Sequence, residues 1–231
     1  MKQKMPTQGR STNTEISSFL EKSKISPSRA KTGRILFTLD ATASRQHSWD
    51  QACQLQGDMF RSTRDIGALT IKLCFYRGFN EFKASPWLID TDKLLGLMSR
   101  VQCQGGYTQI RRALKLAIKE HEKQPVDAVV LIGDAMEENI DELCNLAGIC
   151  GLKKLPVFIF QEGYETTAAT GFAEVARLSG GIHCQFDQHS AEQLRELLTT
   201  IAIYATGGQK ALSTRQHHSE LVHRLLKPTA D

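Results

Sequence analysis

Five side chains whose oxygen atoms could bind a cation occur in three short segments of this sequence, each beside an apolar run. The first segment reads Asp40-Ala41-Thr42-Ala43-Ser44 and places a carboxylate and two hydroxyls at alternating positions. Thr108 and Asp134 occupy the other two segments. Carboxylate, hydroxyl and water oxygens are the ligands that a hard cation such as Mg²⁺ prefers. These residue types predict a cation site if the fold brings the three segments together.

The elements that must position these residues follow an alternating pattern from residue 34 onward. Short apolar runs alternate with amphipathic stretches, which is typical of parallel strands joined by helical crossovers. The clearest helix follows Thr108, because its apolar residues recur at helical spacing. Those residues are Ile110, Ala113, Leu114, Ala117 and Ile118. The pattern predicts a doubly wound α/β domain over residues 33–206, with a mostly parallel central sheet, helices on both faces and one short antiparallel edge strand.

The individual elements are predicted as follows. Strands are expected at 35–39, 68–76, 126–132, 157–160 and 181–186, with the edge strand at 81–84. Helices are expected at 46–61, at 91–100, from 109 to Pro125, around 140–147 and 172–176, and over a last apolar stripe at 194–201. The predicted first and central strands end at Asp40 and at Gly133-Asp134. Ligands of open parallel sheets bind at such carboxyl ends, where the strand order reverses.

The turn after the first strand excludes the usual nucleotide sites. Residues 40–44 contain no glycine, so both the dinucleotide fingerprint and the phosphate loop are absent there. The D-x-T-x-S pattern resembles the first motif, D-x-S-x-S, of the von Willebrand factor A family. Thr108 in Gly105-Gly106-Tyr107-Thr108 and Asp134 in Leu131-Ile132-Gly133-Asp134 match the second and third motifs of that family, in the same order.

The resemblance implies a metal-ion-dependent adhesion site that holds Mg²⁺ or Mn²⁺. Thr42 and Ser44 would be direct hydroxyl ligands, Thr108 a ligand in one of the two states of the family, and Asp40 and Asp134 would act largely through water. A partner protein would then supply an Asp or Glu to the metal. The resemblance is to intracellular, bacterial-type members, which are often associated with AAA+ ATPases or other multi-protein assemblies.

Other interpretations of the same residues stay open at this point. Ser44 and Thr108 could cap helices, and Gly133-Asp134 could be a turn that ends a strand. A metal-dependent phosphohydrolase or phosphotransferase would use Asp40 as its nucleophile, but Thr42 stands where such enzymes need a second Asp. A degenerate structural domain without metal is the third possibility. We predict a binding module with no catalytic residues and no organic cofactor.

Several further features are weaker candidates. Glu137 and Glu138 could extend an acidic rim beside Asp134 or be ordinary partners of a helix dipole. His183-Cys184 with His189 could be a fragment of a zinc site, but a fourth ligand is missing, so a structural role is favoured. Residues 76–79 and 161–164 follow strands and are candidates for specificity at the upper face.

Composition and charge limit the remaining possibilities. The 231 residues are 41% hydrophobic and 23% charged, with a net charge of +4, which fits one globular domain with tails. Residues 1–32 are basic and polar and are expected to be disordered, and 207–231 form a polar tail that could include a short helix. The basic tail lacks aromatic stacking residues, so specific nucleic-acid binding is not expected.

The expected location follows from the cysteines and from hydropathy. The six cysteines show no C-x-x-C pattern and are interpreted as reduced, mostly buried thiols. The N-terminus lacks the apolar run of about 7–15 residues found in signal peptides, and no transmembrane run occurs in the sequence. A cytoplasmic protein without membrane contact is predicted, and its oligomeric state is left open.

Overall fold

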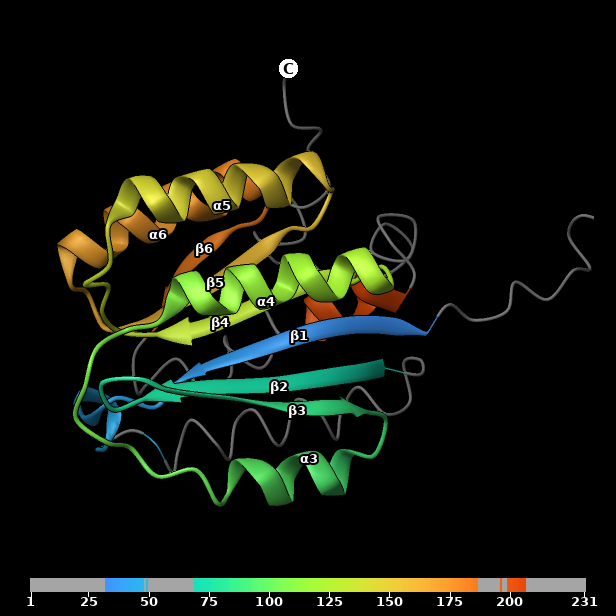
Figure 1. Cartoon of the computed structure of the whole chain (residues 1–231), viewed down its shortest axis with the longest axis horizontal. Coiled ribbons are helices and arrows are strands. Elements are labelled where there is room, and N and C mark those ends of the chain that lie inside the picture. The colour runs from blue at the N-terminus through green and yellow to red at the C-terminus, as the bar shows by residue number, and fades with distance from the viewer. Residues whose placement is uncertain (1–31, 48, 50–68, 187–195, 197–198, 207–231) are drawn as a thin grey trace, which may run out of the picture. The chain divides into compact units, whose positions relative to one another are not determined.

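A six-stranded sheet organises the chain (Figure 1). The computed structural model describes residues 32–47, 49, 69–186, 196 and 199–206. The spatial order is β3-β2-β1-β4-β5-β6, and β3 alone is antiparallel to its neighbour. The predicted doubly wound, mostly parallel sheet is therefore confirmed. The strands are β1 (Gly33–Asp40), β2 (Leu69–Arg77), β3 (Glu81–Leu88), β4 (Ala128–Gly133), β5 (Val157–Glu162) and β6 (His183–Phe186).

Helices cover both faces of this sheet. The assigned helices are the short η1 (Ala43–Arg45), α3 (Thr91–Met98), α4 (Ile110–Lys123), α5 (Ile140–Leu152) and α6 (Thr166–Ser179), and residues 199–206 are also helical. Figure 1 shows α4, α5 and α6 on one side of the sheet and α3 on the other. Within the described residues, no helix is both long and apolar enough to span a lipid bilayer.

Strand β1 lies at the centre of the core because both of its faces are covered. All eight of its residues are buried. Successive side chains of a strand point to opposite faces, so Phe37 packs in one hydrophobic cluster with Leu94 of α3, and Leu36 packs in the other with Leu114 of α4. The continuous apolar sequence of residues 35–39 is the signature of this position.

The edge strand is longer than the sequence indicates. It was predicted at 81–84, whereas β3 continues to Leu88 through Pro86 and Trp87. An edge strand tolerates a proline because one row of its backbone groups has no partner strand. Trp87 pairs with Lys72 of β2 and donates its indole N–H to Glu120 of α4 at 2.7 Å, which extends the pairing.

Some sequence predictions fall outside the described part of the chain. These include most of the helix predicted at 46–61, of which only Trp49 is described beyond His47. The tails at 1–32 and 207–231 stay predictions for the same reason, apart from residue 32 itself. Of the last predicted helix, Ile201 is described, and it is fully buried in the cluster that includes α3.

Candidate functional site

The reversal of strand order brings Asp40 and Asp134 to the same point of the sheet. In the sheet, β2 and β3 follow β1 on one side, and the next strand of the chain, β4, lies on the other side of β1. Asp40 ends β1, and Asp134 follows the last residue of β4. Gly133 leaves room for the Asp40 carboxylate, because a methyl group added there would lie 3.3 Å from Asp40 Oδ2. The predicted convergence of these two carboxylates is what the topology requires.

Asp40 is a fully buried carboxylate with two hydrogen-bond donors. Its Oδ1 accepts the backbone N–H of Thr42 at 2.8 Å, and its Oδ2 accepts the hydroxyl of Tyr76 at 3.2 Å. Burial raises its pKa from 3.8 to about 6, and the nearby charge of Asp134 adds to this rise. The hydrogen bonds from Thr42 and the charge of Arg45 oppose it. A positive charge beside Asp40 would therefore stabilise its ionised form.

The two hydroxyls of the first segment lie next to each other. Thr42 Oγ1 and Ser44 Oγ are 3.0 Å apart. Octahedral Mg²⁺ with oxygen ligands at about 2.0–2.1 Å puts neighbouring ligand atoms about 2.9 Å apart. Ser44 lies within η1 and Thr42 directly precedes it, and the Thr42 side chain makes no capping hydrogen bond. The spacing of this pair suits two neighbouring positions around one cation.

Thr108 is held at this edge by the loop that follows Asp134. Its backbone N–H donates to Glu137 Oε2 at 2.8 Å, and its hydroxyl accepts the Glu137 backbone N–H at 3.1 Å. Gln109 occupies the N-cap position of α4 without a capping side chain. Thr108 makes no hydrogen bond to the other four predicted ligands within the described chain. The structure thus places Thr108 against Glu137, and the Thr108 side chain does not cap α4.

Glu138 replaces the missing cap of α4. Its carboxylate accepts the backbone N–H groups of Ile110 and, at 3.0 Å, of Arg111. Burial raises its pKa, although these hydrogen bonds oppose the rise. Glu137 and Glu138 both precede α5, whose N-cap is Asn139. Glu138 is thus a partner of a helix N-terminus, as one of the two interpretations had it, but of α4 and not of the helix that follows it. Glu137 binds the backbone N–H of Thr108, which precedes α4.

Asp134 contains the feature that bears most directly on a cation. Its Oδ1 is buried, and no described residue donates a hydrogen bond to it. A buried carboxylate oxygen without a donor is unfavourable by about 1–3 kcal/mol or more, and native structures rarely tolerate one without an ion or water. The charge of Asp134 also raises the pKa of Asp40, so the two carboxylates lie within electrostatic range of each other. The donor set therefore fits a hard divalent cation.

A buried ion pair lies beneath these residues, and sequence reasoning missed it. Arg45 is only 1% exposed. Its Nη1 donates to the backbone oxygen of Asp40 at 2.8 Å, and its Nε donates to Glu162 Oε2 at 2.9 Å. The guanidinium also lies 5.6 Å from the centre of the Trp49 ring. Arg45 thus joins the turn after β1 to the end of β5.

Among the described residues, the histidine and cysteine candidates form no metal site. No group of three or more His, Cys, Asp or Glu side chains suitable for a metal occurs among the described residues. His183 Nε2 is hydrogen bonded to Gln161 Oε1 at 3.0 Å, and its ring packs 6.1 Å from that of Phe172. His189 lies outside the described residues. The favoured structural role of His183 agrees with these contacts.

The loop that carries Thr108 is anchored by a close backbone approach, which leads to a stability prediction. A methyl group at Gly106 would lie 1.9 Å from the backbone oxygen of Gly78, whereas one at Gly105 would meet nothing within 4 Å. We expect Gly106→Ala to lower the free energy of unfolding by about 1–3 kcal/mol through overpacking. Gly105→Ala should stay within about 0.5 kcal/mol. Denaturant titration measures both, and equal values would contradict the close approach.

Solved structures of low sequence identity share this fold. A von Willebrand factor type A structure from Catenulispora acidiphila has a TM-score of 0.59 at 14% identity, over 75% of this chain and 43% of that one. The VWA domain of SpRpn10 has a TM-score of 0.56 at 17% identity, over 76% of this chain and 98% of that one. This chain has a von Willebrand factor A (VWA) fold.

A third structure supports the VWA fold. An aerotolerance-related membrane protein from Bacteroides fragilis has a TM-score of 0.59 at 13% identity, over 74% of this chain and 98% of that one. No protein-family model and no curated protein sequence matches the chain. The family resemblance of the three motifs is thus confirmed for the VWA fold, while the metal and the partner stay predictions.

Proposed function

We propose that this VWA domain binds a partner protein through a divalent cation, Mg²⁺ or Mn²⁺, held by Asp40, Thr42, Ser44, Thr108 and Asp134. The observation that carries the proposal is the buried Oδ1 of Asp134, which has no donor among the described residues. The charge of Asp134 also acts on the buried Asp40 carboxylate. The adjacent hydroxyls of Thr42 and Ser44 add ligands at the spacing of an octahedral edge. When bound, the cation supplies positive charge that attracts an external carboxylate.

The protein residues divide the work of binding. Thr42 and Ser44 offer neutral hydroxyls, while Asp40 is turned toward Thr42 and Tyr76 by its hydrogen bonds and acts through water. Thr108 offers a hydroxyl oxygen with one lone pair used by Glu137 N–H and one left for a ligand contact. Such a site neutralises little of the metal charge. The partner therefore presents an Asp or Glu side chain.

A binding function suits the site better than phosphoryl transfer. A nucleophilic Asp40 must reach a substrate, but its side chain is 0% exposed and both of its oxygens accept hydrogen bonds. Thr42 cannot serve as the acid or base that such an enzyme needs beside its nucleophile. We therefore propose a non-enzymatic interaction domain of bacterial type that acts in the cytoplasm, within a multi-protein assembly such as one built on an AAA+ ATPase.

Titration calorimetry with Mg²⁺ tests the metal site. Magnesium is the better probe than softer metals because the histidines outside the described residues bind it poorly. The wild type is expected to bind one ion, and a double variant, Asp40→Asn with Asp134→Asn, is expected to lose the binding heat. Asp141→Asn on the exposed start of α5 is the matched control and should bind as the wild type does. Equal binding by the double variant would place the ion elsewhere.

A further inference from the structure

Arg112 is an exposed cation that protein oxygens hold in one direction. Its Nη1 contacts the backbone oxygen of Asn80 at 3.0 Å, Asn80 Oδ1 at 2.8 Å and Gln109 Oε1 at 2.6 Å. Its guanidinium also lies 5.1 Å from the centre of the Phe82 ring. All of these partners are neutral. Within the described chain, no carboxylate forms an ion pair with Arg112.

The other arginines around this end of the sheet differ from Arg112. Arg111 pairs with Glu142 at 2.7 Å, and Arg77 pairs with Glu81 at 2.8 Å. Two further carboxylates nearby accept backbone N–H groups: Glu138 at the start of α4, and Glu137 from Thr108. Arg112 is therefore the cation here whose charge no described carboxylate neutralises. An external anion would supply the missing counter-charge.

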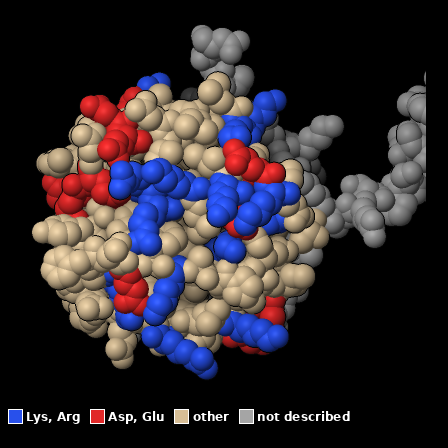
Figure 2. All heavy atoms as spheres, in the orientation of Figure 1, with Lys and Arg blue, Asp and Glu red and all other residues tan. Residues whose placement is uncertain are grey.

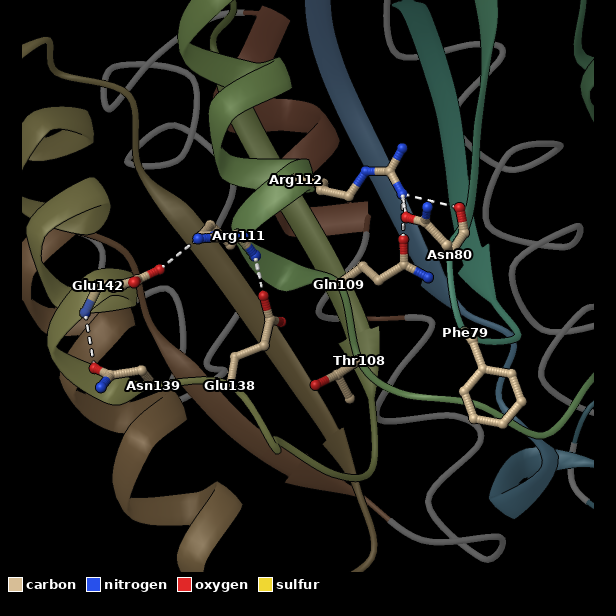
Figure 3. A pocket seen from close by; sticks show the side chains of 9 residues that line it. All are labelled: Phe79, Asn80, Thr108, Gln109, Arg111, Arg112, Glu138, Asn139 and Glu142. Carbon is tan, nitrogen blue, oxygen red and sulfur yellow. Dashed lines mark hydrogen bonds and ion pairs between the residues drawn. The ribbon is translucent and has the colours of Figure 1, made fainter.

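A cavity lies between Arg112 and Thr108, one of the five proposed ligands. Its volume is about 370 Å³. Its lining includes Thr108, Phe79 and Arg112, and also two carboxylates whose partners are Arg111 and the start of α4, namely Glu142 and Glu138. Figure 3 shows Thr108 between two groups of lining residues, with Arg112, Asn80 and Phe79 on one side and Glu138, Asn139 and Glu142 on the other. A peptide whose carboxylate reached a cation at Thr108 would thus place its next side chains in this cavity.

Two exposed aromatic rings pack together here, and one of them, Phe79, lines the cavity. Phe79 is 79% exposed and Tyr107 is 59% exposed, and the ring centres lie 5.6 Å apart in an edge-to-face arrangement. The backbone N–H of Tyr107 donates to the oxygen of Gly78 at 3.2 Å, which fixes the two loops together. Large exposed aromatics on a fixed backbone are typical anchors of protein interfaces.

The charges on the two sides of the site are unequal. Figure 2 shows acidic side chains gathered over the beginnings of α5 and α6, and Lys and Arg side chains over α4. Glu142 lies in the first turn of α5 and Glu165 at the N-cap of α6, whereas Arg111 and Arg112 lie in α4. An acidic partner segment that extends away from the metal is repelled by the acidic side chains of α5 and α6 and attracted by the Lys and Arg side chains of α4. Its path therefore runs along α4 toward Phe79.

We propose that the cavity between Thr108 and Arg112 is a second subsite, which takes a second carboxylate of an extended acidic segment of the partner protein. The segment places one acidic side chain at the metal and the next at Arg112, and its backbone lies across Phe79 and Tyr107. This inference rests on the proposed function, because the first carboxylate defines where the segment begins.

Short synthetic peptides in the presence of Mg²⁺ test the second subsite. One series has a single central Asp in a Ser-Gly background, and a second series adds another Asp at each neighbouring position in turn. For the wild type, one offset should bind about tenfold more tightly than the single-Asp peptide, as expected for a charge-assisted contact. Arg112→Gln should remove this gain and leave single-Asp binding within about twofold.

Matched variants separate charge and apolar contributions. Lys119→Gln makes the same charge change at an exposed position of α4 and should keep the gain. Phe79→Ser with Tyr107→Ser should weaken both peptide series about tenfold, whereas Leu152→Ser, at a residue 89% exposed, should weaken neither. Unfolding midpoints of all variants check that the fold is retained.

The outcomes distinguish the two proposals. If the single-Asp peptide binds in a magnesium-dependent manner but no second Asp improves binding at any offset, the second subsite is rejected and the metal-dependent function stands. If the second Asp still increases the peptide affinity in the Arg112→Gln variant, the second subsite is also rejected. If chelator and Thr108→Ala leave peptide binding unchanged, the proposed function fails. If no peptide binds in Mg²⁺, both proposals fail.

Discussion

Replacing Arg45 with leucine is expected to lower the free energy of unfolding by about 3–5 kcal/mol. Its guanidinium is 1% exposed and pairs with Glu162, whose side chain is 12% exposed. Removing one partner of a buried pair leaves the other charge in a poorly solvated place. The variant also removes the donor to the backbone oxygen of Asp40. Denaturant titration followed by circular dichroism measures the loss.

Two comparisons identify the ion pair as the cause. Arg177 pairs with Glu174 on the exposed face of α6, so Arg177→Leu should change stability by less than about 1 kcal/mol. Adding Glu162→Leu to Arg45→Leu removes the unpaired carboxylate and should recover much of the loss. A loss under about 1 kcal/mol for Arg45→Leu alone would show that the pair contributes little.

Arg45 also connects stability to the proposed metal site. Its charge opposes the rise in the pKa of Asp40. Without the guanidinium, Asp40 holds its proton at higher pH and has weaker attraction for a cation, because a protonated carboxyl must lose its proton to act as a ligand or to hold water. The ion pair therefore belongs to the support of the site as well as to the core.

The sheet could be predicted from the sequence because its signals are local. Residues 35–39 are continuously apolar, and β1 is buried on both faces. The stripe that begins at Ile110 repeats at helical spacing, and Ile110, Ala113, Leu114 and Ala117 are buried in α4. The positions of Asp40 and Asp134 follow from the same strand ends. The end of β3 was missed because Pro86 interrupts the pattern of a strand.

The contacts around the site depend on residues far apart in the chain, and local patterns do not encode them. Arg45 follows two hydroxyl residues and an alanine, a context typical of a solvated helix start, yet its partner Glu162 is 117 residues away. The type and sequence position of Glu138 are typical of a residue in the first turn of α5, but its hydrogen-bond partners lie 27 and 28 residues earlier. Three-dimensional proximity alone reveals these roles.

Asp40→Asn is expected to stabilise the metal-free domain at neutral pH and to abolish its stabilisation by Mg²⁺. Burial raises the pKa of Asp40 from 3.8 to about 6, so the folded state holds this proton more tightly than the unfolded state does. The associated stability is fully present below about pH 4 and is lost as pH rises through about 6. A pKa difference of about two corresponds to about 3 kcal/mol.

The Asn side chain removes the titration while keeping the local contacts. Its amide oxygen still accepts Thr42 N–H, and its amide nitrogen can donate to the Tyr76 hydroxyl. In chelator, the variant should match the wild type near pH 4 and exceed it by up to about 3 kcal/mol at pH 8. Asp141→Asn on the exposed start of α5 should show no such divergence.

Magnesium should remove most of this difference in stability at pH 8. An ion at one hundred times its dissociation constant stabilises the folded wild type by about 2.7 kcal/mol, and the variant should gain nothing. Urea titrations at pH 4 and pH 8, each with Mg²⁺ and with chelator, give four free energies of unfolding for each protein. If the difference in stability between wild type and variant in chelator is the same at both pH values, Asp40 does not titrate near pH 6. Equal stabilisation of both proteins by Mg²⁺ would mean that Asp40 does not help to hold the ion.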